Sequence, residues 1–168
     1  MITPYLRLLR PASWIKNLLV YAALFFAGRW TQPSDLLDTT LVFSCFCGVA
    51  SIAYIANDWL DRHRDRQHPA KADRPLAAGT VTGLGAGILG VGLVALTGLF
   101  IGLLPTPVRL PVMVVVGLYA ATLLLYNLVL KELFALDLIG VAAGYVLRAL
   151  AGGVAISVPV TNWFLLCI

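Results

Sequence analysis

Long apolar runs with almost no charge dominate the chain. A helix of about 20 residues crosses the roughly 30 Å hydrocarbon core of a bilayer, and most of these runs are close to that length or longer. The runs lack the period-two alternation of membrane barrel strands, so a closed barrel is excluded. The pattern predicts an all-α, polytopic membrane helix bundle with about five complete transmembrane helices. The predicted spans are Trp14–Trp30, Thr39–Ala56, Leu76–Leu104, Leu110–Leu130 and Leu138–Val158.

A sixth apolar run begins at Trp163 and stops at Ile168, where the sequence ends. A run this short cannot cross a membrane. We therefore expect residues 1–168 to form a single transmembrane domain, the amino-terminal part of a larger bundle whose chain continues.

The distribution of charge predicts the orientation of the chain in the membrane. The composition is 60% hydrophobic and 12% charged, whereas about a quarter of the residues in soluble domains are charged. The net charge of +4 does not indicate nucleic-acid binding, because most basic residues flank apolar runs. With a cytoplasmic amino terminus, nine basic residues lie on cytoplasmic segments and only Arg29 and Arg109 on the opposite side. The nine are Arg7, Arg10, Lys16, Arg62, Arg64, Arg66, Lys71, Arg74 and Lys131.

Three aspartates follow the second apolar run. If that helix continues, Asp58, Asp61 and Asp65 stand at i, i+3 and i+7 on one helical face, and Asn57 adds a neutral oxygen. Hard oxygen ligands suit Mg²⁺, which binds through carboxylates and substrate phosphates. Basic residues of the same segment could hold the oxygens of a diphosphate. The alternative is a solvated loop whose opposite charges pair locally.

Arg148 lies in the middle of the fifth apolar run. A charge at this depth costs about 2.5–3.5 kcal/mol on insertion scales, so the side chain is expected to point into the bundle. It is either a contact for an anion or half of a structural ion pair with another helix. Lys16 and Asn17, at the start of the first span, are equally consistent with interfacial anchors.

The sequence NDxxDxxxD, here Asn57 to Asp65, resembles the first aspartate motif of the UbiA superfamily of intramembrane prenyltransferases. Its flanks are similar to the branch of decaprenyl-phosphate phosphoribosyltransferases. The resembling segments are Arg10-Pro11 with Trp14-Ile15-Lys16-Asn17, Asp65–Lys71 continuing to Arg74-Pro75, and Tyr145–Gly153.

This resemblance implies a nine-helix bundle in the bacterial cytoplasmic (inner) membrane, with its cavity open to the cytoplasm. Members of the branch transfer phosphoribosyl from phosphoribosyl diphosphate to a polyprenyl phosphate and release diphosphate, in cell-wall polymer synthesis. By analogy Asp58, Asp61 and Asp65 are the catalytic, Mg²⁺-holding residues, and the expected cofactor is Mg²⁺. The residues expected to bind substrate are Lys16, Asn17, Asn57, Lys71, Arg74 and Arg148.

The superfamily has a second acidic motif in its later half, so we expect these 168 residues alone to be inactive. A rival reading is an aromatic prenyltransferase of the same fold, which uses a prenyl diphosphate. A transporter fragment would carry acidic residues near the middle of its spans, and none is present there. A membrane scaffold without a site would tolerate Asp→Glu changes in the motif. An oligomer is compatible with each reading.

Overall fold

The computed structural model of the protein describes residues 3–129 and 136–167, in which every regular element is a helix. Leu130, Lys131 and Ile168, which entered the predictions above, lie outside these residues. Four helices are long and apolar enough to cross a membrane, the fourth through Leu138–Ala155. They are α3 (Pro33–Arg66), α4 (Gly83–Leu103), α5 (Thr106–Leu128) and α6 (Leu136–Ala155). Short helices are α1 (Thr3–Leu9), α2 (Ala22–Phe26) and α7 (Asn162–Cys167). The predicted all-α membrane bundle is confirmed.

The first predicted span differs from the other four. It consists of a 3₁₀ helix, η1 (Pro11–Tyr21), that runs directly into α2. The buried residues of η1, Asn17 and Val20, stand three positions apart, which matches the three residues per turn of a 3₁₀ helix. Because this helix rises about 2.0 Å per residue and an α-helix about 1.5 Å, η1 and α2 together reach about 30 Å, close to the thickness of the bilayer core.

Helix α3 is the longest element, with 34 residues. Pro33 at its first turn and Asp35 near its amino end both suit the start of a helix. At about 1.5 Å per residue α3 is about 51 Å long, well beyond the roughly 30 Å hydrocarbon core. Its last turns, with the aspartate motif, therefore extend past the apolar part of the bundle.

The third predicted span begins later than expected. The run Leu76–Leu104 starts with seven residues that form turns, and α4 begins only at Gly83. The reason is local, since Gly79 adopts φ 74° and the hydroxyl of Thr82 accepts a hydrogen bond from the Gly85 N–H at 3.1 Å as an N-cap.

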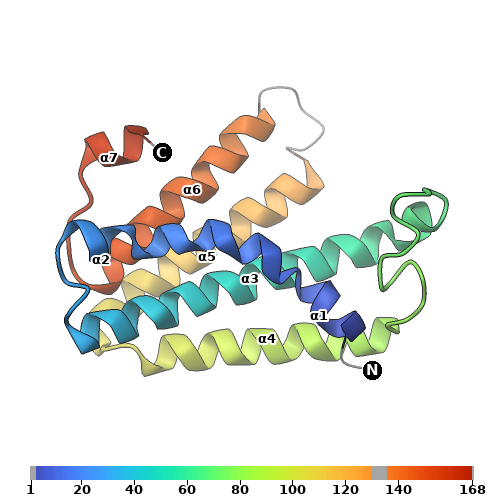
Figure 1. Ribbon diagram of the computed structural model, residues 1–168, viewed down its shortest axis with the longest axis horizontal. Coiled ribbons are helices and arrows are strands. Elements are labelled where there is room, and N and C mark those ends of the chain that lie inside the picture. The colour runs from blue at the N-terminus through green and yellow to red at the C-terminus, as the bar shows by residue number, and fades with distance from the viewer. Residues whose placement is uncertain (1–2, 130–135, 168) are drawn as a thin grey trace.

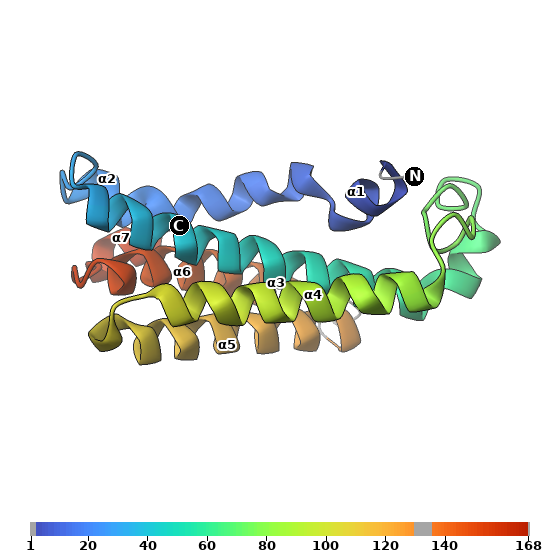
Figure 2. The same cartoon turned by 90° about the horizontal axis from the view of Figure 1, so that it is seen from below.

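Figures 1 and 2 show the long helices lying side by side, with the 67–82 segment and α1 at one end of the bundle and α2 at the other. Helix α3 contacts η1, α4, α5 and α6. The main core includes Val20, Leu24 and Val42, with the rings of Phe46 and Tyr119 stacked at 4.5 Å between centroids. A smaller core at the motif end packs α1 and the 67–82 segment onto α3 and α4; it consists of Leu8, Ile55, Leu76, Val81 and Ala86.

Helix α6 packs closely on η1 at Gly152. A Cβ atom at position 152 would overlap the main-chain carbonyl of Val20. We expect Gly152→Ala to lower the stability of the full-length protein in detergent by about 1–3 kcal/mol, measured by thermal unfolding. At Gly98, in α4, nothing lies within 4 Å of an added Cβ, so Gly98→Ala should be neutral or stabilising by up to about 1 kcal/mol. Equal melting temperatures for the two variants would contradict this packing.

Candidate functional site

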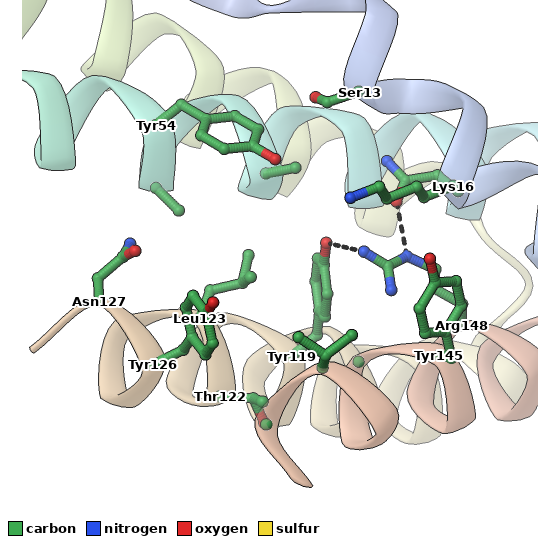
Figure 3. A pocket seen from close by; sticks show the side chains of 16 residues that line it. Ser13, Lys16, Tyr54, Tyr119, Thr122, Leu123, Tyr126, Asn127, Tyr145 and Arg148 are labelled. Carbon is green, nitrogen blue, oxygen red and sulfur yellow. Dashed lines mark hydrogen bonds between the residues drawn. The ribbon is translucent and has the colours of Figure 1, made fainter. Parts of the chain in front are cut away.

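A cavity of about 240 Å³, lined by both polar and apolar side chains, lies between η1, α3, α5 and α6. Figure 3 shows the tyrosines of its wall, which come from three helices. These are Tyr54, Tyr119, Tyr126 and Tyr145. Ser13, Thr122 and Asn127 add further hydrogen-bonding groups. The wall therefore offers many hydroxyl and amide groups inside an otherwise apolar bundle.

Arg148 lies in this cavity and is only 8% exposed. Its Nε donates to Asn17 Oδ1 and its Nη2 to the Tyr119 hydroxyl, both at 2.8 Å (Figure 3). The guanidinium also lies over the rings of Tyr119 and Tyr145, 4.9 and 5.2 Å from their centroids. None of the carboxylates whose side chains the structure describes forms an ion pair with Arg148. Its charge is thus surrounded by neutral partners, an arrangement that favours an anion in the cavity.

Lys16 and Asn17 reach the same cavity from η1. Lys16 is exposed and lines the cavity near Arg148 (Figure 3). Asn17 is 1% exposed, and its amide also donates to Cys47 Sγ at 3.3 Å. Asn17 therefore orients Arg148, while Lys16 adds a second positive charge to the cavity wall.

The aspartate motif lies on α3, which continues through Arg66 as the motif spacing requires. Asp58 and Asp65 are only 2% and 3% exposed. Tyr54, which lines the cavity, stands four residues before Asp58 on α3. Residues four apart lie on the same face of a helix, so the cavity and the motif share one face of α3.

Two arginines neutralise the buried carboxylates. Arg10 Nη2 donates to Asp58 Oδ1 at 2.7 Å. Arg74 Nη1 donates to the same Asp58 oxygen at 3.2 Å and to Asp65 Oδ2 at 2.9 Å. Local pairing of opposite charges, the alternative left open by the sequence, is thus present at these two positions.

The carboxylate oxygens of the motif are chemically suited to bind a cation. A positively charged nitrogen already sits between Asp58 and Asp65, and carboxylate oxygens are the ligands Mg²⁺ prefers. In the part of the chain that the structure describes, no three His, Cys, Asp or Glu side chains converge on one point. Asp61 is half-buried and lines an open hollow of about 510 Å³ with Arg64, Asp65 and Lys71. A bound Mg²⁺ would be held by Asp58 and Asp65, with Asp61 next to them on the helix.

Asn57 lies apart from this cluster. It lines an apolar groove between α3, α4 and α5, where its neighbours include Leu60 and Leu124. Asn127 lines both this groove and the cavity. The structure thus gathers the predicted site residues into two groups, one in the cavity with Lys16, Asn17 and Arg148 and one at the aspartate motif, and leaves Asn57 beside a third hollow.

Sequence reasoning did not assign Arg10 and Tyr119 to the site. Arg10 has φ 52° and ψ 58°, and its guanidinium lies 4.8 Å from the Tyr54 ring centroid. Its place beside Pro11 in a resembling segment was the only signal. Tyr119 was detectable, because a tyrosine hydroxyl within an apolar span needs a hydrogen-bond partner.

These features define an integral membrane protein whose helices enclose a cationic, hydroxyl-lined cavity next to an acidic motif. The chain belongs to the UbiA prenyltransferase family, whose model matches residues 17–168. The family predicted from the aspartate motif is therefore confirmed.

Relatives and solved structures agree with this family. The chain is 39% identical to decaprenyl-phosphate phosphoribosyltransferase of Corynebacterium glutamicum over 166 residues, 96% of this chain and 48% of the relative. The protein of the same name from Mycolicibacterium smegmatis is 38% identical over 170 residues, 99% of this chain and 52% of the relative. The chain spans about half the length of the curated relatives it matches. A UbiA homologue from Archaeoglobus fulgidus bound to DMAPP and Mg²⁺ has the same fold, with TM-score 0.75 and 24% identity over 96% of this chain and 57% of that one.

The cavity geometry predicts unequal roles for two of its tyrosines. Tyr119→Phe removes the partner of Arg148 Nη2 but keeps the ring beneath the guanidinium. We expect it to lower stability by about 1–3 kcal/mol, because a charged donor in a buried site loses its acceptor. The control is Tyr126→Phe, which removes a hydroxyl from the same wall and should change stability by less than about 0.5 kcal/mol. Chemical unfolding in detergent measures both; equal effects would show that the Arg148 bond is unimportant.

Proposed function

We propose that the whole protein is a Mg²⁺-dependent transferase that moves phosphoribosyl from phosphoribosyl diphosphate to a polyprenyl phosphate and releases diphosphate. The observation that carries this proposal is Arg148, a buried cation with neutral partners in a cavity that also holds Lys16. Two relatives with 38–39% identity are named for this type of reaction, which supports the assignment.

The cavity wall favours a sugar phosphate as the donor. Tyrosine, threonine and asparagine groups match the hydroxyls of a ribose, and the charges of Arg148 and Lys16 match a phosphate. A prenyl chain has no hydroxyl groups to use such a wall.

Each group of charged residues has a distinct role in this reaction. Breaking the bond from the anomeric carbon to diphosphate develops negative charge on the leaving group, which Mg²⁺ stabilises when bound. Arg74 and Lys71 neutralise the same charge from the 67–82 segment. Arg148 and Lys16 hold the phosphate at the other end of the donor. The acceptor phosphate is already anionic, so the site needs no strong base.

The proposal places the amino terminus and the acidic end of α3 in the cytoplasm of a bacterium, with the bundle in its inner membrane. The basic residues of the motif end support this orientation, since positive charge accumulates on cytoplasmic segments. A polyprenyl acceptor would then remain in the bilayer while its phosphate reaches the donor at the membrane surface.

The second candidate is an aromatic prenyltransferase. The similar Archaeoglobus fulgidus protein was solved with DMAPP, a prenyl diphosphate, and an apolar groove adjoins the cavity of this chain at Ala53 and Asn127. Both candidates would use the aspartate motif, so loss of activity on mutating it does not separate them. The identity of the donor does.

The donor test uses the full-length protein in liposomes that contain polyprenyl phosphate. We expect Mg²⁺-dependent transfer of label from phosphoribosyl diphosphate to the lipid. Arg148→Gln should lower the rate by about 10²–10³-fold, because it removes a preorganised charge from the donor site. Arg109→Gln is the control, since Arg109 binds the carbonyls of Gly102 and Leu104 at the opposite end of the bundle. Transfer from prenyl diphosphate to a phenolic acid, with none from the sugar donor, would refute the proposal.

The motif aspartates are tested by a change that keeps charge but moves it. We expect Asp65→Glu to reduce transfer by about tenfold or more, because a metal ligand must hold its oxygens at a fixed distance. Asp73→Glu makes the same change on the nearby exposed turn and should leave the rate unchanged. If both variants retain full activity, the motif acts only through its charge and the metal assignment fails.

A further inference from the structure

Arg74 occupies the position that a bound cation would take on the aspartate motif. One nitrogen, Nη1, lies 3.2 Å from Asp58 Oδ1 and 2.9 Å from Asp65 Oδ2. Both carboxylates are almost fully buried, so neither has water to stabilise its charge. Without Arg74, Asp65 would lose its ion pair and Asp58 would keep only Arg10.

The segment that carries Arg74 packs into the core only on the side that follows Arg74. Leu76 and Val81 are buried in the small core at the motif end, and Arg66 Nε donates to the Ala77 carbonyl at 2.8 Å. The preceding turn, from residue 67 to residue 73, is largely exposed. Arg74 therefore lies between a stretch packed in the core and an exposed turn held by its own main-chain hydrogen bonds, so its side chain can change partners without disturbing the core.

The other arginine at the motif is held more firmly. Arg10 stands at the junction of α1 and η1, stacks on Tyr54 and donates to Asp58. Both neighbouring helices pack on α3. Of these two arginines, Arg74 is the one that can leave the carboxylates without displacing a helix.

From this geometry we infer that Arg74 is a resident counter-ion, which leaves Asp58 and Asp65 when a divalent cation binds them. The released guanidinium then points its charge at the diphosphate of the donor. This inference rests on the metal site of the proposed function and adds an exchange of partners: the same two oxygens bind either Arg74 or the metal. It predicts that Arg74 weakens metal binding in the absence of donor.

The experiment measures Mn²⁺ binding to the full-length protein in detergent by electron paramagnetic resonance, without any donor. We expect Arg74→Gln to lower the Kd for Mn²⁺ by about tenfold or more, because the metal no longer competes with a charged hydrogen-bond donor. The control is Arg62→Gln, which removes the same charge from the end of α3; Arg62 donates to the Trp59 carbonyl and lies over the Trp59 ring. Its Kd should change by less than about threefold.

The possible outcomes separate this inference from the metal site itself. If Mn²⁺ binds the wild type and Arg74→Gln equally, or binds the variant more weakly, the metal site stands and the exchange is overturned. An equal gain in Arg62→Gln also overturns it, since general charge would explain the effect. If no form binds Mn²⁺, both the exchange and the metal part of the proposed function fail.

A measurement on the wild type decides the question if Arg74→Gln does not fold. The main-chain amides of Arg74 and Ala78 donate to the carbonyls of Lys71 and Arg74 in this segment. Hydrogen exchange in the Lys71–Ala78 stretch should become several-fold faster when saturating Mg²⁺ is added without donor, because the tether to α3 is released. Unchanged or slower exchange there would overturn the inference.

Discussion

Charge buried in an apolar bundle must be compensated inside the bundle, and this constraint ties the structure together. Asp58 and Asp65 are compensated by Arg10 and Arg74, and Arg148 by neutral hydrogen bonds and aromatic rings. A buried charge that loses its partners is strongly destabilising. The contacts join η1, α3, α5, α6 and the 67–82 segment, which are far apart in sequence. The contacts that compensate the buried charges are therefore the same ones that form the candidate site.

Helix α3 connects the cavity that holds Arg148 with the aspartate motif, since it contributes residues to both. One face carries Tyr54 in the cavity wall and, one turn later, the first aspartate of the motif. A helix is rigid over this distance, so the spacing between the cavity and the motif is fixed by the fold. A donor with a phosphate at one end and a diphosphate at the other could contact both clusters at once.

The sequence predicted the features that depend on local pattern. The apolar runs predicted the four long membrane spans, and the aspartate spacing predicted that the motif lies on a helix. The cost of a charge within the membrane predicted that Arg148 points into the bundle. The sequence missed what depends on partners distant in the chain. The pairing of Arg74 with Asp58 and of Arg148 with Asn17 leaves no mark on hydrophobic periodicity. The close approach of η1 to Gly152 likewise is not revealed by any property of residues 11–21.

Arg148 and Arg74 differ in the partners that an incoming anion must displace. Arg148 has neutral partners, so an anion entering the cavity gains a charge–charge contact without breaking an ion pair. Such a preorganised donor needs little rearrangement when the ligand arrives. Arg74 is already paired with two carboxylates, so an anion can gain it only if another cation takes its place. Under the proposed function, binding of the anion at Arg148 is therefore independent of metal, whereas binding at Arg74 depends on it. In the proposed function, the cavity accordingly recognises the donor and the motif controls the leaving group.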